Sequence, residues 1–167
     1  MKPRVYIEST IFSYLAARPS RDQIVEAHQI ITRQWWETRR QYFDAVVSEA
    51  ILLEISAGDV DAARRRLEIA RSLPSLRVDE RVRQLARRLV ESGTVPESHT
   101  EDATHIAFAA VYGIDYLVTW NCKHIANAAV RPAIEKICWE NAYMPCIICT
   151  PEELMNHERA MDRPDSR

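Results

Sequence analysis

Four side chains that could bind a metal ion lie beside short apolar segments of this 167-residue sequence. Glu8 directly follows one apolar run, and Glu54 is the single acid in a run of bulky aliphatic residues. Asp102 precedes a third run, and Asn121 follows a fourth. Carboxylate and amide oxygens are the ligands that hard divalent cations such as Mg²⁺ and Mn²⁺ prefer.

The chemistry that such a group could perform is phosphoryl transfer. Three clustered carboxylates repel one another unless a cation or a proton lies between them. A bound divalent ion polarises a phosphodiester, helps to generate hydroxide and stabilises the leaving oxygen. Each residue also has a simpler interpretation: a helix N-terminal charge for Glu8 and Asp102, a solvent-reaching edge residue for Glu54, and a turn residue for Asn121. The hypothesis of a metal site therefore depends on the combination of all four residues and not on any one of them.

The elements that must position these residues are strands alternating with helices. β-Branched and aromatic runs predict strands over 4–7, 44–47, 116–119 and 147–149, with a possible short strand over 76–78. Amphipathic or apolar periodicity predicts helices over 22–40, 49–57, 59–72, 79–92, 103–111 and 130–141. This alternation indicates an α/β fold with a parallel sheet covered on both faces, and ligands bind such sheets at the carboxyl ends of the strands.

Local signals add details that a structure can test. A hydroxyl of Ser9 or Thr10 could cap the first helix, and the sequence 98–101 has the pattern of a capping box, which would leave Asp102 free for another task. The helix over 22–40 has an apolar stripe that consists of Ile24, Ala27, Ile31 and Trp35.

Composition restricts the partners. A formal net charge of −2 and a pI near 6.2 exclude a uniformly basic nucleic-acid coat, so RNA would have to meet local arginines. The candidates are Arg64, Arg65, Arg66, Arg81, Arg87 and Arg88, for each of which a solvated helix face is the simpler interpretation. No long apolar stretch or signal peptide is evident, and the cysteines are expected to be reduced, so we expect a cytoplasmic protein without a membrane span.

Two other patterns do not favour a metal centre. Cys146 and Cys149 lie in a strand-like run, where side chains three positions apart point to opposite faces of the sheet. His105 and His124 lie on either side of a predicted strand and do not form a helical zinc motif. We expect His105 to pack near the site and His124 to serve as a local cap.

The segments 5–10, 47–55, 102–107 and 115–121 resemble, in order and spacing, the PIN domain, in particular the VapC-type toxins of toxin–antitoxin pairs. The length of the chain indicates a single domain, over residues 1–156, and the polar residues over 157–167 indicate a frayed tail. The resemblance implies that the domain is a three-layer α/β/α fold with a central, mostly parallel sheet. It implies an Mg²⁺- or Mn²⁺-dependent endoribonuclease that a small antitoxin neutralises. Members of the family commonly form homodimers.

The resemblance also assigns roles to residues. Glu8, Glu54 and Asp102 fall on the family's acidic positions, and Asn121 falls where members carry Asp or Asn. Glu8, Asp102 and Asn121 would be the metal ligands, and Glu54 would lie further out and orient the attacking water. The hydroxyl that follows the family's first acid corresponds to Ser9 or Thr10.

One departure from the family keeps a second function open. The first acid is usually Asp, and Glu8 adds one C–C bond of about 1.5 Å, whereas a misplacement of about 1 Å can reduce a rate about a hundredfold. A PIN-fold module that has lost catalysis and acts by binding protein or RNA is therefore the alternative. A phosphatase-like α/β hydrolase ranks last, since the sequence lacks Asp-x-Asp and Gly-x-Ser-x-Gly motifs.

Overall fold

Five parallel strands form the central sheet in the order β3-β2-β1-β4-β5. The computed structural model describes residues 1–156, so the predicted polar tail over 157–167 lies outside the described residues. The strands are β1 (Arg4–Ile7), β2 (Asp44–Ser48), β3 (Ser75–Leu76), β4 (Tyr116–Val118) and β5 (Ile147–Cys149). The predicted strands are confirmed to within one residue. The short strand expected over 76–78 lies instead at Ser75–Leu76, because β2 pairs with this segment at only two positions.

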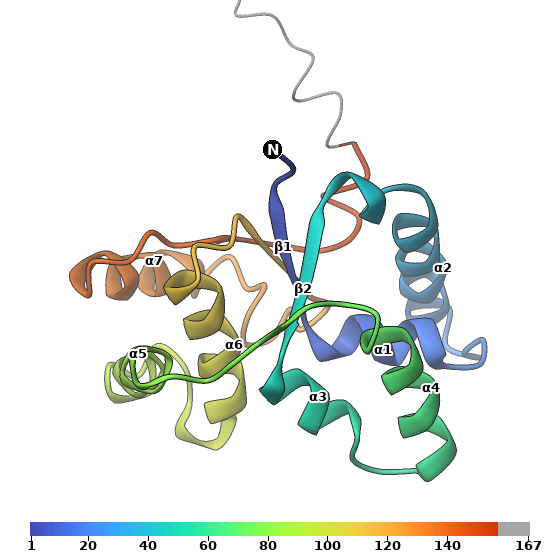
Figure 1. Cartoon of the computed structure of the whole chain (residues 1–167), viewed down its shortest axis with the longest axis horizontal. Helices are drawn as coiled ribbons and strands as arrows, with labels where there is room; N and C mark the ends of the chain where they lie inside the picture. The colour runs from blue at the N-terminus through green and yellow to red at the C-terminus, as the bar shows by residue number, and fades with distance from the viewer. Residues whose placement is uncertain (157–167) are drawn as a thin grey trace, which may run out of the picture.

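Helices cover both faces of the sheet, which confirms the predicted α/β/α layers (Figure 1). The α-helices are α1 (Ser9–Ala16), α2 (Gln23–Thr38), α3 (Glu49–Ile55), α4 (Val60–Ala70), α5 (Glu80–Glu91), α6 (Thr100–Val111) and α7 (Arg131–Glu140). Two short 3₁₀ helices are η1 (Arg40–Tyr42) and η2 (Glu97–His99). In Figure 1, α1, α2 and α4 lie on one side of β1 and β2, and α5, α6 and α7 lie on the other. No helix in the described part of the chain is both long and apolar enough to cross a lipid bilayer.

The core is centred on β1 and α6. Val5, Tyr6 and Ile7 of β1 are completely buried, as expected for the middle strand of a parallel sheet with helices on both faces. Residues 105–110 of α6 are all buried as well, so the prediction of a buried helix in this region is confirmed.

The buried face of α2 differs from the predicted stripe. Ile24 is 70% exposed, and the residues of α2 that are buried are Gln29, Thr32 and Trp35. Gln29 can be buried because its amide bonds to the backbone at Ser20 and Arg18, and Thr32 because its hydroxyl accepts a bond from the Trp120 indole. The predicted stripe is therefore right for Trp35, which is completely buried, and for Ile31, which packs partly buried against the core, and wrong for Ile24 and Ala27, which are exposed.

Two capping predictions were also wrong. Helix α1 is capped by the carboxylate of Glu8, which accepts from the backbone N–H of Thr10, and not by a hydroxyl of Ser9 or Thr10. The capping box over 98–101 does not form: His99 is the N-cap of α6 and makes no side-chain capping bond. The 3₁₀ helix η2 ends at His99, which leaves the 98–101 segment without the extended conformation that a capping box requires.

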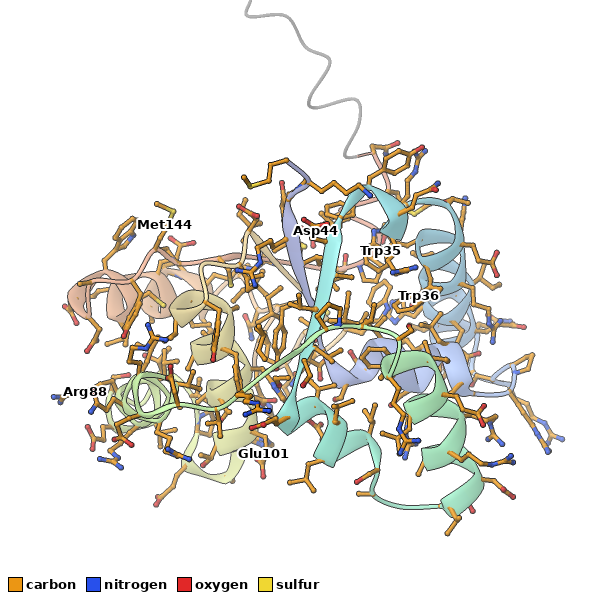
Figure 2. All side chains as sticks on the ribbon, viewed as in Figure 1. Trp35, Trp36, Asp44, Arg88, Glu101 and Met144 are labelled. Atoms are coloured by element: carbon orange, nitrogen blue, oxygen red, sulfur yellow. The ribbon has the colours of Figure 1, made fainter. Side chains whose placement is uncertain are left out.

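The topology fixes where a site can form. From β1 the chain proceeds outward to β2 and β3, and it then returns to place β4 on the other side of β1. Ligands of open α/β sheets bind at the carboxyl ends of the strands at such a reversal. Figure 2 shows Asp44 at the start of β2, and Glu101 at the opposite end of the sheet, where β2 ends. The residues that follow β1 and β4 therefore meet at the Glu101 end.

Candidate functional site

Glu8 lies at the reversal point and is 2% exposed. Its backbone N–H continues the sheet by bonding to Val118 of β4, which fixes the residue at the carboxyl end of β1. Oε1 accepts one hydrogen bond, from Ser9 Oγ at 2.7 Å. Oε2 accepts three, from the N–H of Thr10 (3.1 Å), Thr10 Oγ1 (2.5 Å) and Thr119 Oγ1 (2.6 Å). A carboxylate has about four acceptor positions, two on each oxygen, so Oε1 is the oxygen with one position still available.

Glu54 lies across Ser9 from Glu8. Ser9 Oγ lies 2.7 Å from Glu8 Oε1 and 2.8 Å from Glu54 Oε1, and its single proton is donated to one of these two carboxylates at a time. Oε2 of Glu54 lies 2.9 Å from Nε2 of His105, whose other ring nitrogen lies 2.9 Å from the hydroxyl of Tyr6. Because an ionised carboxylate only accepts, Nε2 of His105 carries the proton and donates. The expectation that His105 packs near the site is confirmed by these contacts, and the side chain is 1% exposed.

Asp102 opens α6 on the other side of the site. Its Oδ1 accepts from Nδ2 of Asn121 at 3.0 Å, and its Oδ2 lies 3.1 Å from Nδ1 of His124. The Asn121 Oδ1 accepts from the backbone N–H of His124, so the orientation of the amide is fixed at both ends. His124 is therefore a partner of Asp102, and its expected role as a mere local cap was wrong. The turn that begins at Asn121 brings the His124 ring over the start of α6.

Thr119 links the half of the site that contains Glu8 and Glu54 to the half that contains Asp102 and Asn121. Its hydroxyl donates to Glu8, and it accepts from the backbone N–H of Asn121 at 2.9 Å. Polar contacts at hydrogen-bond distance thus link Glu54 through Ser9, Glu8, Thr119 and Asn121 to Asp102. The four residues selected from the sequence belong to this one network. The three acids and nearby histidines form two groups of ligand atoms, each within 4.8 Å: one comprises Glu8, Glu54 and His105, and the other His99, Asp102 and His124. Glu8 and Asp102 therefore lie in different groups.

The pKa values of Asp102 and Glu54 are shifted by burial and by the charges and hydrogen bonds of residues in and next to the two groups. The pKa of Asp102 lies above its ordinary value mainly because the carboxyl group is partly buried, and the negative charge of Glu8 acts in the same direction. Hydrogen bonding by Asn121 and the charge of His124 oppose this rise. Burial also raises the pKa of Glu54, but the bonds from His105 and Ser9 and the charge of His105 outweigh it, so the pKa of Glu54 is lowered. Glu54 is therefore ionised at neutral pH.

The candidate RNA-binding arginines mostly have structural partners. Arg64, Arg81 and Arg88 each form an ion pair with an acid two or three positions away. Arg65 and Arg66 donate to backbone carbonyl groups at and just beyond the ends of α1 and α3. Arg88 extends from the outer side of α5, far from the carboxyl ends of the strands (Figure 2). These contacts favour the interpretation of a solvated helix face.

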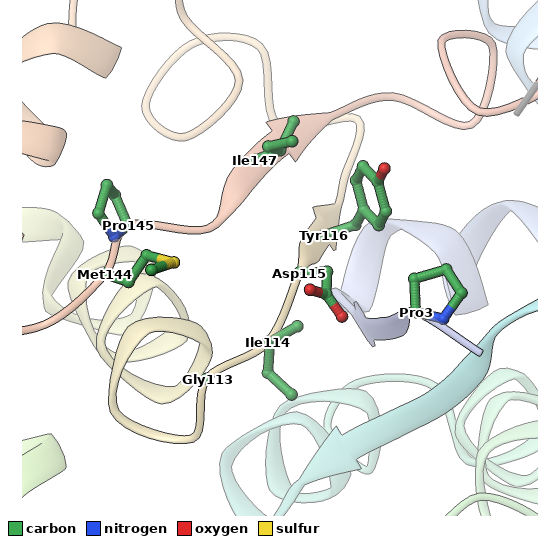
Figure 3. Close-up of a pocket in the computed structure, with 8 residues that line it drawn as sticks. All are labelled: Pro3, Gly113, Ile114, Asp115, Tyr116, Met144, Pro145 and Ile147. Atoms are coloured by element: carbon green, nitrogen blue, oxygen red, sulfur yellow. The ribbon is translucent and has the colours of Figure 1, made fainter. Parts of the chain in front are cut away.

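Two hollows differ in their chemistry. One of about 400 Å³ lies beside Glu54 and His105, with Leu53 and Thr104 in its mainly apolar wall. The other hollow, of about 280 Å³, lies at the opposite end of the strands, where Pro3, Tyr116 and Ile147 line it (Figure 3). Its acid, Asp115, accepts from the N–H of Arg4 and helps to hold β1 in place. The first hollow gives access to the candidate site, and the second offers no comparable cluster.

Sequence reasoning missed three residues of the site. Thr119 could have been found by the argument that selected Glu8, since it too follows a strand directly. His99 and His124 had no such signal, because neither follows a strand or lies on an apolar stripe. Their approach depends on the turn after Asn121 and on the end of η2.

His105 is expected to stabilise the protein through both of its ring nitrogens. A His105→Phe variant keeps a ring but leaves Glu54 and Tyr6 without this partner, so its free energy of unfolding should fall by about 1–3 kcal/mol. Urea denaturation measures the change. The control His28→Phe should stay within about 0.5 kcal/mol, since His28 stacks on Trp120 and a phenyl ring can do the same. Equal stability of His105→Phe and the wild type would contradict the role of His105.

Comparisons with known proteins support the fold. No protein-family model and no curated protein sequence matches the chain. The solved structures that resemble it include the sarcin–ricin loop cleaving toxin VapC20 of Mycobacterium tuberculosis, at a TM-score of 0.51 and 13% identity, covering 72% of this chain and 92% of that chain. Another is VapBC2 of Rickettsia felis bound to a promoter DNA fragment, at a TM-score of 0.55 and 13% identity, covering 87% and 97%. The chain thus has the PIN-like fold of VapC toxin structures.

Proposed function

We propose that the protein is a metal-dependent endoribonuclease and the toxin of a toxin–antitoxin pair. The observation that carries the proposal is the network of polar contacts at hydrogen-bond distance that joins Glu8, Glu54, Asp102 and Asn121 at the reversal point of the sheet. Four separate segments of the chain contribute to it. The likeness of the fold to VapC structures adds support from a second direction.

The residues have the chemistry that a hard divalent ion requires. Glu8, with an acceptor position left on Oε1, Asp102 and Asn121 are the proposed ligands of Mg²⁺ or Mn²⁺. Burial is the main reason for the raised pKa of Asp102 and the negative charge of Glu8 adds to it, so a cation bound by both carboxylates would offset their repulsion. When bound, the ion would polarise the scissile phosphodiester and lower the pKa of the attacking water.

The other residues of the network prepare the reaction. Glu54 is the proposed residue that orients and deprotonates the water, since it is ionised and its side chain is 42% exposed. His105 and Ser9 each hold one of its oxygens and so fix the direction of the carboxylate. Thr10 and Thr119 hold Oε2 of Glu8 in the same way, which leaves Oε1 to face a ligand. This fixed geometry is what metal-assisted cleavage requires of the protein.

The partners follow from the same proposal. The substrate is RNA, and because VapC20 is described as cleaving the sarcin–ricin loop, a hairpin of that loop is the first substrate to test. VapBC2 was solved with a promoter fragment, and we propose that a small antitoxin also binds this chain. A cytoplasmic homodimer completes the proposal.

One observation favours the alternative of a non-catalytic module. Glu8 accepts four hydrogen bonds and caps α1, which is sufficient reason for a carboxylate at this position without any metal ion. In that case the role of the network is structural, and its hydrogen bonds hold β1, β4 and α1 together. The two functions differ in whether RNA is cleaved.

A cleavage assay decides between them. The purified chain is incubated with structured RNA and Mg²⁺ or Mn²⁺, and a parallel sample contains EDTA. We expect defined cleavage products with either metal and none with EDTA. Binding of the metal or of RNA without cleavage would overturn the nuclease proposal and favour the module.

A further inference from the structure

The second group of ligand atoms, His99, Asp102 and His124, has a different chemical character from the carboxylates beside it. It comprises two imidazoles and one carboxylate, and its ligand atoms lie within 4.8 Å of one another. The two histidine rings have their centroids 3.7 Å apart. Nδ1 of His124 is 3.1 Å and Nδ1 of His99 is 3.8 Å from Oδ2 of Asp102. Imidazole nitrogens suit Zn²⁺ and other late transition metals, whereas Mg²⁺ prefers oxygen.

The histidines of this group have nitrogens available to bind an ion. Within residues 1–156, neither ring nitrogen of His99 has a hydrogen-bond partner, and Nε2 of His124 has none either. His105 in the neighbouring group differs, because Tyr6 and Glu54 occupy both of its nitrogens. In the group with His99 and His124, Nδ1 of His124 bonds only to Oδ2 of Asp102, so a cation that replaces this proton would break no hydrogen bond to a residue outside the group.

Accessibility and charge are compatible with a bound cation. The side chains are 41% exposed for His99, 14% for His124 and 13% for Asp102, so an ion can reach the group and still be partly shielded from water. The start of α6 carries a partial positive charge that opposes a cation. Asp102 and the neighbouring Glu101 in the first turn offset it. Two close imidazoles would repel if both were protonated, whereas a shared metal ion keeps both of them neutral.

We propose that His99, Asp102 and His124 form a binding site for a transition-metal ion of the Zn²⁺ class, which shares Asp102 with the oxygen-ligand site proposed at Glu8 and adds two nitrogen ligands to it. The three protein ligands leave at least one coordination position to water or to an anion, as in zinc sites that are not purely structural. Asn121 orients the carboxylate through its bond to Oδ1, which leaves Oδ2 facing the two histidines. The site depends on this constellation and not on any nuclease activity.

Titration of the purified, metal-free chain with Zn²⁺ alone tests the proposal, with Co²⁺ absorption as a second readout of nitrogen ligation. We expect one Zn²⁺ ion to bind to each chain. His99→Gln and His124→Gln should each weaken binding at least about tenfold, since each removes a ligand. His28→Gln, which changes a histidine on α2, should leave the affinity unchanged.

Three results would overturn the proposal. One is the absence of Zn²⁺ binding at micromolar concentrations. A second is wild-type affinity in both His99→Gln and His124→Gln, both of which affect partly exposed side chains and should fold. The third is binding that Glu8→Gln weakens and His99→Gln does not, which would assign the ion to the Glu8, Glu54 and His105 group. This titration does not measure RNA cleavage. A negative result would therefore contradict the proposed zinc site without contradicting the proposed nuclease activity.

Discussion

Replacement of Asp102 by asparagine is expected to reduce metal-dependent RNA cleavage more than about a hundredfold. Loss of a mere partner of a metal ligand commonly reduces activity 10–100-fold, and Asp102 is proposed as a ligand itself. The fold should be retained, because an asparagine Oδ1 can still accept from Asn121 and the His124 ring can change its tautomer. The measurement is the initial rate of cleavage of a labelled RNA hairpin at saturating Mg²⁺ or Mn²⁺.

Glu101→Gln is the matched control for this variant. It removes a carboxylate from the adjacent position of α6, but this side chain is exposed and outside the network. We expect its cleavage rate to stay within about threefold of the wild type, since it contacts none of the proposed ligands. Cleavage by Asp102→Asn at a rate close to that of the wild type would contradict the assignment of Asp102.

Replacement of Glu8 by alanine is expected to have the largest effect on stability. Three of the donors that now bond to Glu8 Oε2 would lose their acceptor in a buried site. A buried donor without a partner costs about 1–3 kcal/mol, and Ser9 can still donate to Glu54. We therefore expect the free energy of unfolding to fall by about 3–5 kcal/mol, as measured by urea denaturation.

Two further variants separate the stability that Glu8 contributes as a helix cap from the stability that it contributes as an acceptor for buried donors. Asp22→Ala removes the exposed cap of α2, which should cost only about 1 kcal/mol. Glu8→Gln keeps the size of the side chain and one acceptor oxygen, so its loss of stability should lie between those of the two alanine variants. If Glu8→Ala were no less stable than Asp22→Ala, the network would not have the structural importance inferred here.

The fold could be predicted from the sequence because its strands are short, continuous apolar runs. In a parallel sheet buried on both faces such runs are required, and β1 and β4 contain almost nothing else. The ends of those strands then indicated Glu8 and Asn121 directly. Glu54 and Asp102 could be selected because each is an acid at the edge of an apolar helix, and the network includes both of them.

What the sequence could not predict depends on contacts between distant segments. Thr32 can lie on the inner face of α2 because its hydroxyl accepts from the indole of Trp120, 88 positions away. His124 reaches Asp102 only through a turn whose shape is set by backbone bonds to Asn121. The cap of α1 is Glu8, since its longer side chain can fold back onto Thr10, which residue preferences for capping do not favour. In each case a long-range partner decides the conformation.

The central claim is that Glu8 and Asp102 hold one divalent ion between them. Crystals of the His124→Gln variant, in which the histidine group cannot compete, are soaked in Mn²⁺ and measured at the manganese absorption edge. We predict one anomalous peak within coordination distance of Glu8 Oε1 and of the Asp102 carboxylate. A map without a peak next to Glu8, in which its carboxylate still contacts only Ser9, Thr10 and Thr119, would contradict the account.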